Sequence, residues 1–565
     1  MSDKTNKPHQ TGRADADALL ASAREWIDKG QWDEASRILL AALETNPGHA
    51  DILRNLARVQ LHRHEYLPAL RTFDRLIGSG QADAADYTDT GDALTDLGEY
   101  AQAVDTYRRS LNLMPDDPRN HHNLARVLYR LGQTDSAARH LKQCARLCDQ
   151  IDPWLSLATI LPGCSHATQQ DILSARRQFA DRLTQIEPAS KAIRSKRPKA
   201  SAKSKLRVAY LAAFFHCANY MKPVWGLINS HNRDAFEIHL FSDSPRDSDW
   251  PGYLRHPDDQ VHEVDALDNA ALGMLIESRD IDILVDLNAY SEPRRLGLFL
   301  GHPAPVTLAW FNMYATSGLP GIDYLVGDPW VIRPEEAGFF SETLLTLPVS
   351  YLTFAVYHDA PEVATPPCTH TGELTFGSLV TQYKITPAVL DAWAEILRRT
   401  HNTRLFLANR TLKSKWNRHY LLEEFQRRGA DIGRITLDGP RDHYAYLQYY
   451  DQIDIALDAF PYNGGTTTME ALWQGVPVLS YDGDRWASRT TFSLLAQSPV
   501  KDFVAVNCRE MVERAVAMAE DPATPDRLGK LRRHLRKRLA DSLVCDTGAL
   551  CRHMEALYFK VCSKQ

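Results

Sequence analysis

The chain has 565 residues, with 44% apolar and 24% charged side chains and a formal net charge of -6. This is ordinary globular usage, which excludes wholesale disorder and collagen-like structure. The near balance of 65 basic and 71 acidic residues argues against a nucleic-acid binder. Because there is neither an apolar run of about 18 residues nor a secretory signal, we expect a cytoplasmic protein without membrane contact. Nine scattered cysteines favour reduced thiols.

After residues 1–16, which we expect to be disordered, residues 17–152 repeat with a period of 34 residues. Small or turn-forming residues recur in fixed columns, such as Gly30, His64, Gly98 and Gly132, and Ala35, Ala69, Ala103 and Ala137. Such a period is typical of tetratricopeptide repeats (TPRs), which stack as helix pairs into an α-helical solenoid. We expect four repeats whose groove binds a protein or peptide; a scaffold or homodimerisation role is the alternative.

Residues 153–205 form the expected connector, with helices over 153–185 and a basic segment over 191–205. This segment carries seven Lys or Arg residues and no acid. A solvated linker is the favoured interpretation, and contact with nucleic acid or a membrane is the alternative.

From residue 206 onwards, apolar strand patterns alternate with helical ones, which predicts parallel sheets covered by helices. We expect a Rossmann-like lobe over 206–370, a second Rossmann-like lobe over 371–545 and a C-terminal helix over 546–565. Strands are expected at 206–213, 236–243, 280–287, 304–311 and 323–328, and then at 374–380, 403–409, 434–437, 453–458, 476–481 and 502–506. Two doubly wound α/β domains without a Gly-x-Gly-x-x-Gly motif fit a two-lobed nucleotide-sugar enzyme.

The largest group of candidate ligand-binding residues lies between the strand at 453–458 and the helix expected at 466–474. Gly464 and Gly465 allow close backbone approach, and the following helix N-terminus offers N–H groups to a diphosphate. The hydroxyls of Thr466, Thr467 and Thr468 add donors, and a carboxylate one turn into the helix, that of Glu470, can accept hydrogen bonds from ribose. The alternative is an ordinary helix start capped by the first of these threonines.

Two further candidates follow other strands. Lys384 comes shortly after the strand at 374–380, where it can neutralise charge on a departing diphosphate, although strand-end lysines are often merely exposed. His216 follows the first strand of the other lobe, where it can act as a general base. A packed loop histidine is the alternative there.

Together with the repeats, the stretches DIDILVDLNAY, HPAPVTLAWF and IDIALDAFPYNGGTTTMEALWQGVPVLS resemble the O-GlcNAc transferase and SPINDLY-like family of inverting glycosyltransferases. The resemblance covers about residues 17 to 560. It implies a GT-B fold, a nucleotide-sugar donor, no cofactor, no catalytic metal and transfer to Ser or Thr hydroxyls of proteins. UDP-GlcNAc is the expected donor. GDP-fucose or UDP-glucose, a non-protein acceptor, and an inactive TPR interaction scaffold are the alternatives.

The resemblance also implies roles for individual donor-lobe residues. Lys384 matches the lysine that contacts the donor diphosphate, and Gln382 lies beside it. Thr466 and Thr467 match a phosphate-binding threonine pair, and Glu470 stands where the family has a ribose-binding carboxylate.

On the nucleobase and acceptor sides, the chain departs from the family pattern. Tyr446 stands where a histidine near the base is common. His216 resembles a cleft histidine considered as the catalytic base, but the segment before it is about two residues shorter than usual. The usual Asp-Phe there reads Phe214-Phe215.

Overall fold

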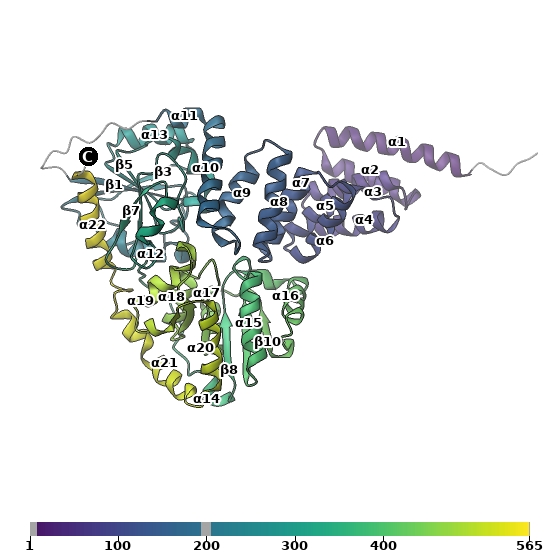
Figure 1. Ribbon diagram of the computed structural model, residues 1–565. Coiled ribbons are helices and arrows are strands. Elements are labelled where there is room, and N and C mark those ends of the chain that lie inside the picture. Colours follow the sequence, from purple (N-terminus) through teal and green to yellow (C-terminus); the bar gives the residue numbers. More distant parts are fainter. Residues whose placement is uncertain (1–7, 194–204, 564–565) are drawn as a thin grey trace, which may run out of the picture. The chain divides into compact units, whose positions relative to one another are not determined.

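The repeat region consists of successive helix pairs in this computed structural model, which describes residues 8–193 and 205–563 (Figure 1). The helices are α1 (Pro8–Asp28), α2 (Trp32–Thr45), α3 (Ala50–His62), α4 (Tyr66–Gly78), α5 (Ala84–Asp96), α6 (Tyr100–Leu113), α7 (Pro118–Arg130) and α8 (Thr134–Leu147). Each pair matches one predicted 34-residue segment, so the TPR prediction is confirmed.

The repeat columns have clear structural reasons. Gly30, Gly98 and Gly132 have positive φ angles between the two helices of their pairs, and His64 takes the same left-handed conformation with φ 58°. The alanine column is completely buried in all four repeats. A second column reads Ala23, Ala57, Gly91 and Ala125. At Gly91, a Cβ atom would lie 2.6 Å from the ring of Tyr107, which explains the glycine there.

The N-terminal boundary differs from the expectation, because α1 begins at Pro8 and includes residues that we expected to be disordered. The polar run at 8–16 has no apolar stripe to signal a helix. Residues 1–7 lie outside the described residues, and so does most of the expected basic linker, residues 194–204. The connector contains α9 (Asp152–Ile160), α10 (Gln169–Ile186) and α11 (Pro188–Lys191).

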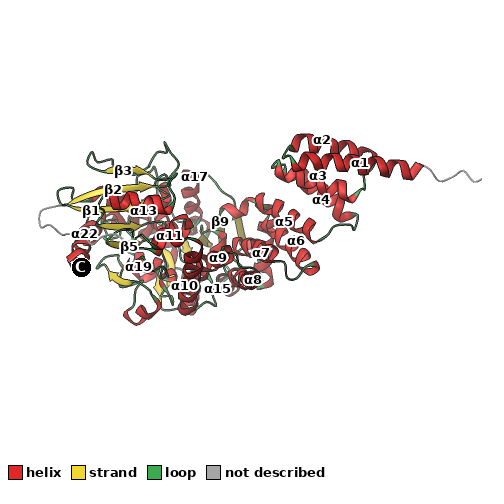
Figure 2. Cartoon of the chain, turned by 90° about the horizontal axis from the view of Figure 1, so that it is seen from above, coloured by secondary structure: helices red, strands yellow, loops and turns green. Residues whose placement is uncertain are grey.

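The chain divides into two compact units. One contains residues up to Leu131 together with 139–149 and 414–420, and the other contains the remainder. Strands occur only in the second unit among the residues that the structure describes (Figure 2). None of the helices in the described ranges is long and apolar enough to cross a membrane.

The first lobe of the second unit has a parallel sheet of seven strands in the order β3-β2-β1-β4-β5-β6-β7. The strands are β1 (Leu206–Ala212), β2 (Phe236–Ser242), β3 (Gln260–Glu263), β4 (Ile283–Asp286), β5 (Val306–Trp310), β6 (Tyr324–Gly327) and β7 (Thr343–Thr346). Strands β3 and β7 escaped the sequence analysis because these short edge strands are largely solvent-facing and lack a buried apolar run. The main helices are α12 (Ala218–Ser230) and α13 (Asn269–Ser278).

The second lobe has a parallel sheet of six strands in the order β10-β9-β8-β11-β12-β13. The strands are β8 (Leu374–Ser378), β9 (Thr403–Ala408), β10 (Ile435–Asp438), β11 (Ile455–Leu457), β12 (Val478–Tyr481) and β13 (Val504–Ala505). The helices are α14 (Cys368–Thr371), α15 (Pro387–Arg399), α16 (Lys415–Arg427), α17 (His443–Leu447), α18 (Thr466–Trp473), α19 (Thr490–Ala496), α20 (Cys508–Glu520) and α21 (Thr524–Ala540). Both doubly wound sheets are therefore present, as predicted.

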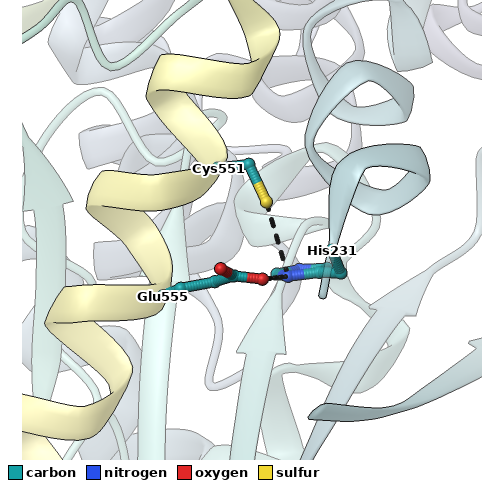
Figure 3. A group of neighbouring side chains, drawn as sticks. All are labelled: His231, Cys551 and Glu555. Carbon is teal, nitrogen blue, oxygen red and sulfur yellow. Dashed lines mark hydrogen bonds and ion pairs between the residues drawn. The ribbon is translucent and has the colours of Figure 1, made fainter. Parts of the chain in front are cut away.

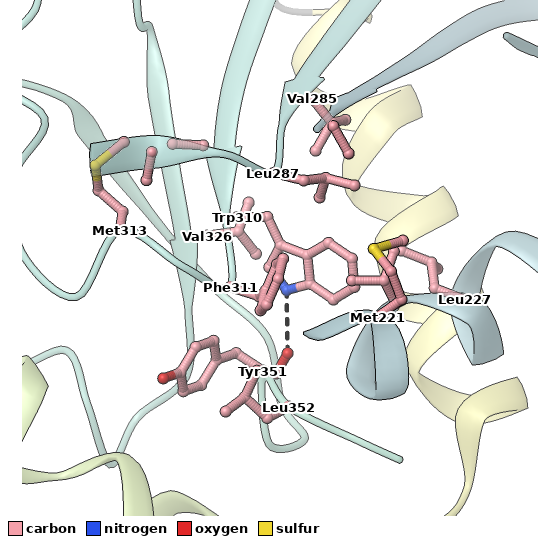
Figure 4. Packing of buried hydrophobic residues seen from close by; sticks show 14 of the residues in the cluster. Met221, Leu227, Val285, Leu287, Trp310, Phe311, Met313, Val326, Tyr351 and Leu352 are labelled. Carbon is pink, nitrogen blue, oxygen red and sulfur yellow. Dashed lines mark hydrogen bonds between the residues drawn. The ribbon is translucent and has the colours of Figure 1, made fainter. Parts of the chain in front are cut away.

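The core of the first lobe lies between its sheet and α12. Trp310 at the end of β5 is fully buried and donates a hydrogen bond from Nε1 to the carbonyl of Tyr351 at 3.0 Å (Figure 4). Met221 and Leu227 of α12 lie next to the indole, on the side away from its nitrogen (Figure 4). The last helix, α22 (Thr547–Ser563), follows the second lobe in the chain but packs against α12 of the first.

Candidate functional site

The predicted donor residues lie at the switch point of the second sheet. Strands β8 and β11 are neighbours although they are not consecutive in the chain, so the strand order reverses between them. Lys384 follows β8, and the segment from Asn463 to Glu470 follows β11. Ligands of open α/β sheets bind at the carboxyl ends of strands at this position.

Helix α18 begins without a side-chain cap. Gly465 is its N-cap residue and Thr466 its first helical residue, so the alternative in which Thr466 caps the helix is wrong. The first N–H groups of a helix have no partner within the helix, and together with the helix dipole they favour an anion. The start of α18 therefore keeps its anion-binding groups available to a ligand.

The side chains of Thr467 and Thr468 pack so closely against Gly464 that no larger residue fits there without displacing them. A Cβ atom at this position would lie 2.6 Å from the Oγ1 atoms of both Thr467 and Thr468. The neighbouring Gly465 has no such constraint, since its nearest atom would be Cγ2 of Thr490 at 3.9 Å. The first glycine thus fixes the threonine side chains, and the second tolerates a small side chain.

A buried aspartate anchors the glycine loop to the sheet. Asp458 accepts hydrogen bonds from the backbone N–H of Gly464 at 2.9 Å and from Oγ of Ser480 at 2.7 Å. Thr491 of α19 adds a second anchor, because its Oγ1 lies 3.0 Å from Oγ1 of Thr468 and donates to the Gly464 carbonyl at 3.2 Å. The loop is therefore held rigidly before any ligand binds.

Lys384 points to this loop. Its Nζ donates to the carbonyl of Asn463 at 2.6 Å and lies 4.1 Å from the ring centroid of Tyr462. Burial lowers the pKa of Lys384 to about 8, although the charge of Asp458 opposes that shift. A buried ammonium with a single neutral acceptor is ready to pair with an anion. Gln382, one turn earlier and buried, accepts a hydrogen bond from Nδ2 of Asn409 at 3.2 Å.

Glu470 already has two cationic or polar partners. Nζ of Lys222, on α12 of the first lobe, and Nε2 of His443, on α17, each lie 2.9 Å from its Oε1. Burial opposes ionisation of Glu470, but the His443 hydrogen bond and the Lys222 charge outweigh it, so the pKa of Glu470 is lowered. Both contacts use the same oxygen, which leaves Oε2 as the atom for a further donor.

A small pocket, with free space for little more than a water molecule, adjoins this carboxylate. It is lined by Lys222, Phe354, Val356, His358, Leu447, Met469, Glu470 and Trp473. Nε2 of His358 is buried and has no hydrogen-bond partner among the described residues. Burial lowers the pKa of His358. Because Nδ1 donates to the carbonyl of Asp359 at 3.0 Å, the neutral ring offers Nε2 to a bound group as an acceptor.

The sequence analysis missed Lys222, His443 and His358. Lys222 is the one charged residue of an apolar helix, and this was a usable signal. His443 lies three residues before Tyr446, on the neighbouring helical turn. Tyr446 itself donates its hydroxyl to the carbonyl of Leu379 at 3.0 Å, so its ring rather than its hydroxyl is the part left for a nucleobase.

His216 lies at the carboxyl end of β1, at the switch point of the first sheet between β1 and β4. Its Nε2 is 3.2 Å from Sγ of Cys217, and its Nδ1 is buried without a hydrogen-bond partner among the described residues. A histidine with an uncommitted nitrogen can accept a proton.

Amide and aromatic side chains fix the surrounding edge of the first lobe. Asn312 donates from Nδ2 to the hydroxyl of Tyr220 at 2.5 Å and to the carbonyl of Asn288 at 3.0 Å. The Tyr220 hydroxyl in turn donates to the carbonyl of Leu287 at 2.8 Å. Burial raises the pKa of Asp286, at the end of β4, to about 6. Hydrogen bonds from the backbone N–H groups of Asn288 and Ala289 oppose this shift but do not cancel it.

Comparison with known protein families supports this arrangement. The profile of glycosyl transferase family 41 matches residues 157–359 and 372–554. TPR profiles match residues 27–89 and 91–132.

Individual relatives agree with the family match. A probable UDP-N-acetylglucosamine–peptide N-acetylglucosaminyltransferase SPINDLY from Solanum lycopersicum is 33% identical over 300 residues, which is 52% of this chain and 32% of that protein. The relative named SEC from Arabidopsis thaliana is 26% identical over 374 residues, which is 63% of this chain and 37% of that protein. The matched region thus spans about a third of these curated relatives.

A solved structure extends the likeness to almost the full chain. An O-GlcNAc transferase mutant from Thermobaculum terrenum superposes with a TM-score of 0.74 at 26% identity, covering 99% of this chain and 100% of that one. The repeats, the two parallel sheets and the profile match over most of the chain lead to one conclusion: the chain belongs to glycosyl transferase family 41.

Proposed function

We propose that this chain transfers N-acetylglucosamine from UDP-GlcNAc to Ser or Thr hydroxyls of proteins, with inversion and without a metal ion. The observation that carries the proposal is the convergence of Lys384 with the uncapped start of α18 at one switch point. A cation and a helix N-terminus together stabilise the negative charge that develops on a departing diphosphate. These groups supply the role that a metal ion has in many phosphate sites.

We place the nucleoside part of the donor beside Glu470, next to the small pocket that adjoins it. Oε2 of Glu470 can accept hydrogen bonds from ribose hydroxyls while Oε1 stays paired with Lys222 and His443. Nε2 of His358, which has no partner among the described residues, can accept a hydrogen bond from a base, and Leu447 supplies apolar surface. This division of roles supports a nucleoside diphosphate rather than a simple phosphate.

For the acceptor side, we propose that His216 removes the proton of the attacking hydroxyl. Its Nδ1, which has no hydrogen-bond partner among the described residues, supports this role. A donor phosphate oxygen is the alternative base. The TPR solenoid is proposed to hold the protein acceptor, as the word peptide in the relatives' names suggests; dimerisation through the repeats is the competing role.

Thermal unfolding with UDP, UDP-GlcNAc, GDP and GDP-fucose tests the donor. A ligand at about 100 times its dissociation constant stabilises the folded protein by roughly 2.7 kcal/mol. We expect UDP and UDP-GlcNAc to raise the melting temperature and the GDP compounds to leave it unchanged. A shift with GDP compounds alone would move the proposal to GDP-fucose, and no shift with any of them would favour an inactive scaffold.

Transfer itself needs a second measurement. Incubation with labelled UDP-GlcNAc and a protein extract should place label on Ser or Thr of proteins, as read by mass spectrometry. Hydrolysis of the donor without labelled protein would argue for a non-protein acceptor.

A further inference from the structure

A second cluster of reactive side chains lies where the chain's last helix returns to the first lobe. His231 directly follows α12, and Cys551 and Glu555 stand four residues apart on one face of α22 (Figure 3). None of the three belongs to the switch-point sites described above. His231 is more than 300 residues from the other two in the sequence, so no local motif indicates the cluster.

The three side chains point their ligand atoms at one another. Nδ1 of His231 lies 3.0 Å from Oε1 of Glu555 and 3.6 Å from Sγ of Cys551 (Figure 3). One ligand atom from each residue lies within 4.8 Å of those from the other two. A nitrogen, an oxygen and a sulfur thus surround a common point.

These separations can be compared with the edges of a tetrahedral zinc site. Usual Zn–N, Zn–O and Zn–S bond lengths give an N–O edge of about 3.3 Å and an N–S edge of about 3.6 Å. The observed N–S separation matches that edge, and the observed N–O separation is a few tenths of an ångström shorter. Small side-chain adjustments therefore suffice to admit the ion.

A second layer of contacts orients two of these ligands. Nε2 of His231 lies 2.7 Å from the hydroxyl of Tyr210, which lies 2.9 Å from the hydroxyl of Tyr558. Without a metal, Nδ1 carries the ring proton and donates it to the Glu555 carboxylate, which can only accept. When a metal binds Nδ1, the proton moves to Nε2, where the Tyr210 hydroxyl can accept it. The backbone N–H of Asn232 donates to Oε1 of Glu555 at 2.8 Å and fixes the carboxylate.

We propose that His231, Cys551 and Glu555 form a Zn²⁺ site that joins α22 to the end of α12. Imidazole, thiolate and carboxylate are all zinc ligands, and three protein ligands leave a fourth position for water. The Glu555 side chain is 15% exposed, whereas His231 is fully buried, so the ion and its water reach the site from the carboxylate side. Binding releases the thiol proton of Cys551 to solvent.

The site lies apart from the proposed transferase site, and its expected effect is on stability. Its ligands come from the first lobe and from a helix that follows the second lobe, so zinc would hold the end of the chain on the first lobe. Stability should therefore respond to zinc, while nucleotide binding should not.

Zinc titration of the full-length, metal-stripped protein tests the proposal directly. We expect one high-affinity Zn²⁺ in the wild type, measured by competition with a chromophoric chelator, and a higher melting temperature with zinc. Glu555→Gln and Cys551→Ser should lose this site, whereas Cys562→Ser, a matched change on the same helix, should keep it. Tyr210→Phe should weaken binding by about ten- to a hundredfold, as loss of a second-layer contact does.

Cobalt provides a readout that separates ligation from misfolding. Co²⁺ in the wild type and in Cys562→Ser should show thiolate-to-metal charge-transfer absorption. This absorption should be absent in Cys551→Ser. If the metal-free Cys551→Ser protein unfolds at the same temperature as the metal-free wild type, the loss reflects the missing ligand and not misfolding. Equal zinc affinity in wild type, Glu555→Gln and Cys551→Ser would overturn the proposal. It would leave the three residues as a hydrogen-bonded contact between helices.

Discussion

The two parallel sheets share a strand order around their switch points but present different chemistry there. The second sheet presents a glycine loop, an uncapped helix start and the ammonium of Lys384. The first sheet presents His216 and a network of amides and hydroxyls around Asn312. One edge is suited to a multiply charged leaving group, and the other to a neutral hydroxyl that must lose a proton.

The difference teaches how a common fold is specialised by its loops. In the second lobe, the proposed anion-binding groups are backbone N–H groups at the start of α18, so a few glycines and threonines suffice. In the first lobe, α12 also begins after a switch-point strand without a side-chain cap, but the residue before its N-cap is His216 rather than glycine. Variants of each edge should therefore fail in different ways.

Removal of the Lys384 charge should give the largest effect. Lys384→Met should lower kcat by about 10²–10³-fold, because one preorganised contact to developing negative charge is lost. Donor affinity should fall less than kcat, since the charge on the diphosphate grows in the transition state. Steady-state kinetics with a nucleotide-binding titration would check this, and wild-type turnover would remove Lys384 from the mechanism.

Next in size is a pair of glycine substitutions. Gly464→Ala should weaken donor binding by about ten- to a hundredfold, because its Cβ displaces the hydroxyls of Thr467 and Thr468. Gly465→Ala should have little effect, since nothing lies within 3.9 Å of the added carbon. Calorimetric titration with UDP measures both. Equal losses in the two variants would show that the loop, not the placement of the threonines, sets affinity.

On the first sheet, His216→Ala should lower kcat by at least tenfold with little change in donor affinity, since general-base help is worth about 10²–10⁴-fold. Cys217→Ala, which removes the neighbouring thiol, is the control and should keep the wild-type kcat. A higher KM or a lower melting temperature with kcat unchanged in His216→Ala would assign His216 to packing and the base role to a donor phosphate oxygen.

The smallest effect is a pH dependence at Lys384. Its pKa is lowered to about 8 by burial, so the charged form that attracts a diphosphate is lost as the pH rises through that value. The kcat/KM of the free enzyme should therefore fall by roughly tenfold between pH 7 and pH 9. Lys384→Arg keeps its charge over this range and should lack that limb. An unchanged limb in Lys384→Arg would assign it to another group.

Features whose residues are close together in the sequence could be predicted from it. The residues from Gly464 to Glu470 form one contiguous motif after a recognisable strand, so their placement could be predicted. The 34-residue period likewise fixed the helix pairs of the repeats. The helix over 387–399 was also predicted, with its first-turn proline.

Other features depend on residues that are distant in sequence and meet only in the fold. The pairing of Lys222 with Glu470 joins two lobes, and the contact of His231 with Glu555 depends on the return of α22. The edge strands β3 and β7 carry no buried apolar run, and hydrogen bonds to neighbouring strands define them instead. Local periodicity in the sequence carries no information about such pairings.

The structure of the chain bound to UDP tests the central claim most directly. We predict that the diphosphate lies at the start of α18, with Nζ of Lys384 hydrogen-bonded to a phosphate oxygen in addition to, or in place of, the Asn463 carbonyl. The ribose should contact Oε2 of Glu470. A diphosphate bound elsewhere, with Lys384 still on Asn463 alone, would contradict the account.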